Sequence, residues 1–254
     1  MTACPVSLDC SDSVWQVTLD RPAHGNACSA ELVAALDGIL QRAEDERPQA
    51  VVLSGAGRHF CTGFDLSDIA SAHDDALLAR FVRIELVLQR LARAPFLTAA
   101  VAHGRAMGAG ADLFTACEVR LVRDGATFAF PGARGFGLVL GTRRLCDAVG
   151  RGTALAWIEG GVSITSEEAL RTGLATGALG EGECAKSAIQ ARLHADESLG
   201  RALRRAARPA GATEDAFDLQ RLVESAARPG LRDRIAAYVE RNSARRAAQA
   251  RSDR

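Results

Sequence analysis

The sequence predicts a mixed α/β fold, and three observations support that prediction. Short β-branched runs alternate with longer segments whose apolar residues recur at helical spacing. Two of the apolar runs lead directly into glycine-rich loops that open a helix. Beyond about Ala185 the chain is rich in Ala and Arg and helical in character. Such an alternation is typical of a sheet that helices cover.

The N-terminal part supplies the first strands and the first helix. Val14–Leu19 alternates in polarity, which predicts a strand. Ser29 is a typical N-cap, and it precedes a helix that Pro48 ends. The apolar residues of this helix define one inward face: Leu32, Val33, Leu36, Ile39 and Leu40. Residues 50–53 are apolar throughout, which predicts a strand covered on both faces.

The middle of the chain continues the alternation. Residues 77–91 have helical periodicity, and the predicted helix ends before Pro95. Val119–Val122 and residues 127–130 are β-rich and predict two further strands. Residues 153–158 predict a helix.

The last part of the chain is predicted to be helical. Thr165 and Glu168 form a capping-box pattern that opens a short helix, and Gly173 ends it. The Gly-Arg-Gly sequence at residues 150–152 predicts a turn. From about Gly200 onward, amphipathic segments form a helical extension. We therefore divide the chain into a core of residues 1–199 and a helical oligomerisation region of residues 200–254.

Composition limits the classes of function. The chain has 254 residues, 48% of them hydrophobic, which suffices for one α/β core with a small extension. Its formal net charge of zero argues against generic nucleic-acid binding and against a polybasic membrane patch. The sequence contains neither a run of about eighteen apolar residues, as a membrane span needs, nor a secretory pattern at its start. The seven cysteines are scattered without metal-binding spacing, which predicts reduced thiols in the cytoplasm and no metal site.

Three motifs follow one another in order along the chain. Residues 21–29 read Arg-Pro-Ala-His-Gly-Asn-Ala-Cys-Ser. Residues 55–66 read Gly-Ala-Gly-Arg-His-Phe-Cys-Thr-Gly-Phe-Asp-Leu. Residues 103–113 read His-Gly-Arg-Ala-Met-Gly-Ala-Gly-Ala-Asp-Leu, with Cys117 and Glu118 shortly after. Glycine loops of this kind leave backbone N–H groups free and let a ligand approach closely.

Together the three motifs resemble those of the crotonase (enoyl-CoA hydratase/isomerase) superfamily, and the resemblance covers essentially the whole chain. It implies a spiral core of ββα units with a C-terminal helical extension that builds a homotrimer or a dimer of trimers. It also implies an acyl-CoA thioester as substrate. No separate cofactor is expected, because coenzyme A is part of the substrate.

The resemblance assigns an oxyanion hole to the two glycine loops. Its donors are the backbone N–H groups of Phe64 and Ala109, which would stabilise negative charge on the thioester oxygen. The flanking residues of the two loops are then expected to bind substrate: Gly63, Asp65, Leu66, Gly108 and Gly110. The simpler alternative is that both loops are tight strand-to-helix turns.

The proton-transfer groups depart from the family pattern. Hydratases of the family use two glutamates, and Asp112 occupies the position of the first. Asp112 is either a catalytic acid/base or a carboxylate that caps the start of a helix. Gly132 occupies the position of the second glutamate, in a loop about two residues shorter than usual. Arg134 either binds a substrate carboxylate or phosphate, or is an ordinary solvent-facing arginine.

The sequence leaves the reaction open. With one carboxylate, hydration, double-bond isomerisation and hydrolysis of a β-keto thioester can all be written. The loss of the second glutamate also suits a CoA-ester-binding or assembly protein without catalysis. A dinucleotide-binding module is not supported, because the chain lacks its glycine fingerprint followed by a ribose-binding acid.

Overall fold

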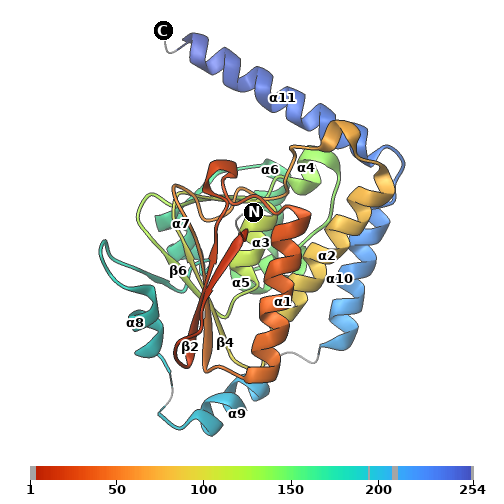
Figure 1. Cartoon of the computed structure of the whole chain (residues 1–254). Helices are drawn as coiled ribbons and strands as arrows, with labels where there is room; N and C mark the ends of the chain where they lie inside the picture. Colours follow the sequence, from red (N-terminus) through yellow and green to blue (C-terminus); the bar gives the residue numbers. More distant parts are fainter. Residues whose placement is uncertain (1–3, 194, 208–210, 253–254) are drawn as a thin grey trace.

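The computed structural model describes residues 4–193, 195–207 and 211–252, and its centre is a six-stranded sheet (Figure 1). The strand order is β1-β2-β3-β4-β6-β9, with β1 antiparallel to β2 and every other pair parallel. The bounds of these strands are β1 Val6–Asp9, β2 Val14–Leu19, β3 Ala50–Gly55, β4 Leu97–Ala102, β6 Val119–Val122 and β9 Gly177–Ala178.

A second, three-stranded sheet lies beside the first. It consists of β5 (Arg105–Met107), β7 (Thr127–Ala129) and β8 (Ile164–Thr165), in that order. Each of β4 and β6 in the large sheet is followed in sequence by a short strand of the small sheet and then by a helix. This repeat of two strands and a helix is the unit that the sequence implied, so the α/β prediction is confirmed.

Helices occupy most of the remaining chain. Their bounds are α1 Ala30–Glu46, α2 Asp74–Arg93, α3 Ala109–Thr115, α4 Gly132–Phe136, α5 Thr142–Val149, α6 Arg151–Gly160, α7 Ser166–Thr172, α8 Ala185–Gln190, α9 Glu197–Ala207, α10 Ala212–Ala226 and α11 Leu231–Ser252. Two 3-10 turns, Pro22–His24 and Ile69–Ser71, complete the described elements. None of the described helices is long and apolar enough to cross a membrane.

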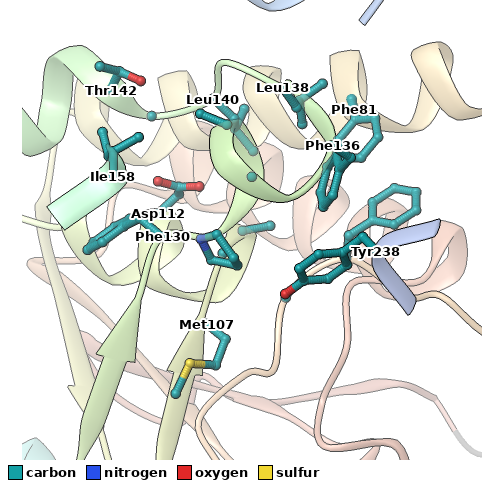
Figure 2. Close-up of a pocket in the computed structure, with 18 of the residues that line it drawn as sticks. Phe81, Met107, Asp112, Phe130, Phe136, Leu138, Leu140, Thr142, Ile158 and Tyr238 are labelled. Carbon is teal, nitrogen blue, oxygen red and sulfur yellow. The ribbon is translucent and has the colours of Figure 1, made fainter. Parts of the chain in front are cut away.

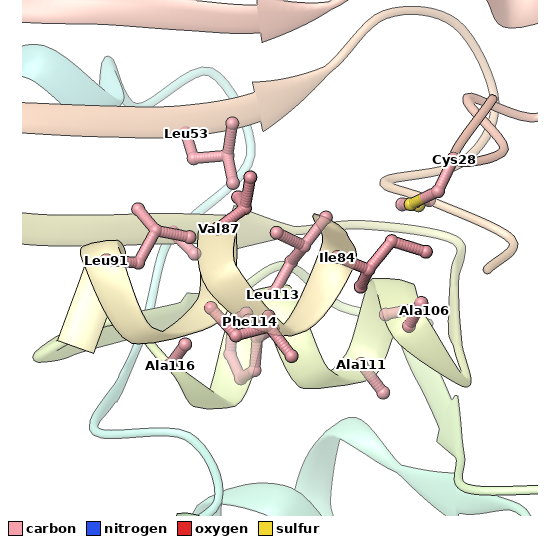
Figure 3. Close-up of a cluster of buried hydrophobic side chains, with 14 of the residues drawn as sticks. Cys28, Leu53, Ile84, Val87, Leu91, Ala106, Ala111, Leu113, Phe114 and Ala116 are labelled. Carbon is pink, nitrogen blue, oxygen red and sulfur yellow. The ribbon is translucent and has the colours of Figure 1, made fainter. Parts of the chain in front are cut away.

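The large sheet is covered on both faces, which explains why its central strands are apolar throughout. On one face, side chains of α2 and α3 such as Val87 and Phe114 pack with Leu53 of β3 in the main core (Figure 3). On the other face, Val52 of β3 packs in a smaller cluster with Ile189 of α8. Burying this apolar surface is the main favourable term for the fold.

Local signals placed several helix ends correctly. The Ser29 hydroxyl accepts a hydrogen bond from the Leu32 N–H at the start of α1, and Thr165 caps α7 in the same way. Gly173 adopts the left-handed conformation that ends α7. The turn predicted at residues 150–152 is instead the junction of two helices, in which Gly150 ends α5 and the other two residues begin α6.

The helix α10 and the first half of α11 pack against the main core of the chain. Leu222 and Ala226 of α10, and Leu231 and Ile235 of α11, are buried in the main core. The second half of α11 then projects away from the body of the molecule (Figure 1). The division at residues 199 and 200 stays a prediction, and α9 runs across it.

Candidate active site

A largely apolar pocket of about 110 Å³ lies where the two glycine loops meet α2, α4 and α11 (Figure 2). Most of its wall is formed by large apolar side chains: Phe81, Phe130, Phe136, Leu138, Leu140 and Ile158. The glycine loops contribute Gly63, Phe64, Gly108 and Ala109, and Leu66 lies nearby on the same wall. The pocket therefore brings together most of the residues that the sequence assigned to substrate binding.

The two glycine loops are in direct backbone contact. The Met107 N–H donates to the Cys61 carbonyl at 2.9 Å, and the Cys61 N–H donates to the Arg105 carbonyl at 3.2 Å. Gly63 has a φ of +97°, and a Cβ on it would overlap the Met107 carbonyl and stand 3.6 Å from the Ala109 nitrogen. Only glycine fits there, because the conformation and the contact both exclude a side chain.

The Phe64 and Ala109 N–H groups are both available at the pocket wall. The Gly63 carbonyl accepts from the Cys28 N–H and the Asp65 N–H donates to the Cys28 carbonyl, so the Phe64 N–H points the opposite way. Ala109 is the first residue of α3, where an N–H has no partner within the helix. Among the described residues neither N–H donates to another protein group.

Charged and aromatic contacts hold the first loop in place. Asp65 accepts a hydrogen bond from Arg21 at 2.8 Å and another from the Ser67 N–H. Burial alone would raise the pKa of Asp65, but these hydrogen bonds outweigh it and lower the pKa. The Phe64 ring stacks on Phe81 at 4.2 Å and carries the Arg80 guanidinium 4.3 Å from its centre.

Two of the expected substrate-binding residues therefore have structural positions instead. Asp65 is buried in its ion pair with Arg21 and does not line the pocket. Gly110 packs against the Cys61 carbonyl, where a Cβ would overlap backbone, and it also lies outside the pocket wall. Both residues fix the shape of the loops, and neither presents a group to the pocket.

Asp112 presents the carboxyl group of the pocket (Figure 2). The residue is 5% exposed, and its buried Oδ1 has no hydrogen-bond partner among the described residues. Gly141 makes room for the carboxyl, because a Cβ at that position would overlap it. Asp112 lies in the fourth position of α3 and accepts no capping hydrogen bond from the helix, so the geometry does not support the capping alternative.

Burial raises the pKa of Asp112 well above the usual range of an aspartate. The Arg144 guanidinium lowers that pKa and the Glu85 carboxylate raises it, and both effects are smaller than that of burial. Arg144 and Glu85 are themselves buried and paired through two hydrogen bonds of 3.0 and 2.5 Å. The positive charge that lowers the Asp112 pKa is thus shared with the Glu85 carboxylate, so it does not offset the effect of burial.

Gly132 and Arg134 both belong to the short helix α4, which the sequence analysis treated as a loop. Gly132 lines the pocket, and a Cβ there would meet only the Leu138 carbonyl at 3.4 Å, so the position has room for a side chain. Arg134 is exposed and donates to the Gly160 carbonyl at the end of α6. Its guanidinium lies outside the pocket wall, so a role in binding a substrate anion there is not supported.

Sequence reasoning missed Tyr238 and the aromatic wall. Tyr238 of α11 lines the pocket, although the sequence analysis assigned the region after Gly200 to oligomerisation and not to the site. Phe81 was part of a predicted helical face, but no local signal showed that this face ends at the pocket. In the described part of the chain, no group of three or more His, Cys, Asp or Glu residues could hold a metal ion.

The sheet topology and the pocket between two glycine loops define a class of protein, and comparisons with known proteins identify it. The family model for enoyl-CoA hydratase/isomerase matches residues 9–246. A crystal structure of a candidate enoyl-CoA hydratase/isomerase from Bordetella parapertussis superposes with a TM-score of 0.88 at 40% identity, covering 93% of this chain and 99% of that one. This chain therefore belongs to the enoyl-CoA hydratase/isomerase family.

Curated relatives agree with that assignment. The protein echA6 of Mycobacterium bovis, named as a probable enoyl-CoA hydratase, is 34% identical over 168 residues, 65% of this chain and 67% of that protein. The ethylmalonyl-CoA decarboxylase of Xenopus laevis is 30% identical over 169 residues, 65% of this chain and 56% of that protein. The relatives are therefore named for more than one reaction, a hydration and a decarboxylation.

The raised pKa of Asp112 makes the free energy of unfolding depend on pH. An aspartate in an unfolded chain ionises near pH 3.9, whereas the raised pKa keeps folded Asp112 protonated to higher pH. The stability that the neutral carboxyl provides is therefore complete below about pH 4 and is lost as pH rises through the folded pKa. Asn does not titrate, so Asp112→Asn does not lose this stability as pH rises. The unfolding free energy of the variant minus that of the parent should therefore increase by up to about 1.4 kcal/mol per pH unit in this window.

Urea unfolding of both proteins at a series of pH values measures this difference. Asp147→Asn is the matched control, because it makes the same substitution at an exposed residue that does not line the pocket. A difference between Asp112→Asn and the parent that does not change with pH would contradict a raised pKa.

Proposed function

We propose that this protein acts on an acyl-CoA thioester, with an oxyanion hole made by the Phe64 and Ala109 N–H groups and with Asp112 as its single proton-transfer residue. The observation that carries the proposal is the position of Asp112. One unpartnered carboxyl lies in an apolar pocket, beside two loops in which the Phe64 and Ala109 N–H groups are unengaged. Family membership supplies the substrate class.

The oxyanion hole would supply most of the electrostatic stabilisation. When a thioester loses an α-proton, negative charge moves to its oxygen, and two fixed N–H donors stabilise that charge without reorganising. Removing one such donor typically costs roughly 3–4 kcal/mol of barrier. The backbone contact between the two loops supports this role, because it holds both donors rigidly.

The single carboxyl favours isomerisation of an enoyl-CoA double bond. In that reaction one group removes a proton at one carbon and returns it to another, while the electron pair passes through the thioester enolate. Asp112 can perform both transfers, and its raised pKa brings the carboxyl closer to the pH at which it can both accept and release a proton. Hydration of the two-carboxylate type lacks its second group, because Gly132 has no side chain.

One observation favours a second candidate, the decarboxylation of a 2-carboxyacyl-CoA. Burial raises the pKa of Asp112 in its apolar pocket, so its carboxyl stays protonated to higher pH and can serve as a proton donor. Breaking the bond to the carboxylate releases CO₂ and leaves an electron pair as the enolate, which takes the Asp112 proton at the α-carbon. Water then restores that proton. The similarity to a decarboxylase is consistent with this candidate.

A panel of CoA esters separates these candidates. The protein is incubated with a 3-enoyl-CoA, crotonyl-CoA, acetoacetyl-CoA and ethylmalonyl-CoA, and the products are analysed by mass spectrometry and absorbance. Unchanged mass with altered absorbance indicates isomerisation, and loss of CO₂ indicates decarboxylation. Gain of water indicates hydration, and release of free CoA indicates hydrolysis. Binding of every ester without turnover would indicate a CoA-ester-binding protein, and absence of binding would refute the proposal.

Asp112→Asn should retain ester binding and lose most of the turnover. The substitution keeps the shape of the side chain but removes the proton-transfer group, which typically costs about 10²–10⁴-fold in rate. Steady-state kinetics with the active ester of the panel measure the loss, and calorimetric titration with the same ester checks that binding survives. Undiminished turnover would show that another residue carries the chemistry.

Gly132→Glu should raise the hydration of crotonyl-CoA. The position lines the pocket and has space for a side chain, so the added carboxylate can activate a water molecule opposite Asp112. Gly38→Glu is the matched control, because Gly38 is exposed on α1 with nothing within 4 Å of a Cβ. Equal hydration by the two variants would show that position 132 does not direct a carboxylate at the substrate.

We also infer that the protein assembles as a homotrimer or a dimer of trimers in the cytoplasm. The second half of α11 supports assembly, because its ribbon projects away from the body of the molecule (Figure 1), and an isolated short helix is only marginally stable in water. Exposed apolar residues on α9 and α10 add to this: Leu199, Leu203 and Phe217. The seven free cysteines suit a reducing compartment.

Light scattering at micromolar concentration should therefore give the mass of three or six chains. Deleting the end of the chain from residue 243 onward should shift the mass toward that of one chain. A monomer in the full-length protein would contradict the assembly.

A further inference from the structure

Tyr238 is the second ionisable side chain in the described wall of the pocket, and it enters from α11. The other polar side chains of that wall are Asp112, Thr62 and Thr142. Figure 2 shows the Tyr238 ring reaching in from the side opposite Asp112, with its hydroxyl directed toward the pocket interior near Met107. An apolar pocket with few polar groups uses those groups to orient a ligand.

The structure contains a seat for the Tyr238 ring. Gly135 of α4 faces it so closely that a Cβ there would stand 2.8 Å from a ring carbon. Phe136 meets the ring edge to face, with centroids 5.4 Å apart. One turn further along α11, Arg241 donates to the Gly135 carbonyl at 2.9 Å. Three contacts therefore fix the first half of α11 on α4 and with it the direction of the phenol.

The Tyr238 hydroxyl has no hydrogen-bond partner among the described residues, although the ring is half-buried. The hydroxyl is therefore free to bond a ligand that enters the pocket, and a Tyr side chain is suited to this because its ring is apolar and its tip is polar. The helix that seats the ring also carries Gly132, the position at which the second carboxylate of the family is missing. The Tyr238 hydroxyl of α11 thus enters a pocket in which Gly132 of α4 offers no polar side chain.

We propose that Tyr238 is a further catalytic residue, whose hydroxyl donates a hydrogen bond to an oxygen of the bound acyl-CoA ester. This proposal rests on the proposed function and adds a second contact opposite Asp112. The hydroxyl binds the reacting part of the ester more strongly as charge develops on its oxygen, because hydrogen bonds to charged acceptors are the stronger ones. The C-terminal helix thereby completes the active site of its own chain.

Tyr238→Phe tests the hydroxyl alone, since the ring keeps its contacts with Gly135 and Phe136. We expect kcat/KM for the active ester to fall roughly 10- to 100-fold, with an unchanged unfolding midpoint. Gly135→Ala is the second variant: its methyl group displaces the ring, so it should cause a similar loss while the hydroxyl is still present. Glu240→Gln, an exposed change on the same helix, is the control and should retain full activity.

The outcomes distinguish this proposal from the proposed function. If the parent turns over an ester and Tyr238→Phe does so equally well, Tyr238 is not catalytic while the proposed function stands. If the parent binds crotonyl-CoA without turning it over, a 10-fold or greater loss of affinity in Tyr238→Phe still supports the contact, and equal affinity overturns it. If the parent binds no ester of the panel, both proposals fail.

Discussion

The direct backbone contact between the two glycine loops is the constraint on which the rest of the site depends. Three glycines make it possible: Gly63 against Met107, Gly104 against Arg58 and Gly110 against Cys61, where any Cβ would overlap a carbonyl. Because the loops pair through backbone hydrogen bonds, they bring the ends of two separate strands to one wall. The Phe64 and Ala109 residues then lie on the same wall, and among the described residues neither N–H donates a hydrogen bond to the other loop. The surrounding ion pairs and aromatic stacks hold this arrangement, and the pocket exists because of it.

The second constraint is a carboxyl without a partner. An unpaired buried carboxylate is costly, and the neutral form reduces that cost. A structural aspartate would be expected to recruit a donor, as Asp65 does from Arg21 and Ser67. The buried Oδ1 of Asp112 has no such donor among the described residues, and Arg144, whose charge acts on it, is held by Glu85 in a buried pair. Perturbed carboxyl groups of this kind concentrate at functional sites, and here the perturbation and the two unengaged N–H groups lie in one pocket.

Patterns local in sequence predicted much of this structure, and long-range packing accounts for the rest. The strands at Val14–Leu19 and Val119–Val122 and the caps at Ser29 and Thr165 were predicted because each depends on a few adjacent residues. The short strand β5 and the helix α4 were missed, because each is only a few residues long and is defined by its partners. The glycine loops marked the pocket. The aromatic wall and the exclusion of Arg134 depend on how distant helices meet, and no local pattern encodes that.

The short helix α4 shows how local sequence and long-range packing act together at the pocket. It is a five-residue helix, Gly132–Phe136, that a left-handed Gly137 caps. Its Gly135 faces the ring of Tyr238. A longer side chain at position 135 would keep α11 away, so small residues in α4 set how deeply the C-terminal helix enters the pocket. At position 132 the same helix has no side chain, and a Cβ there would meet only the Leu138 carbonyl at 3.4 Å. The tail thus adds a phenol to the polar lining of the pocket, and any change that moves α11 also changes that lining.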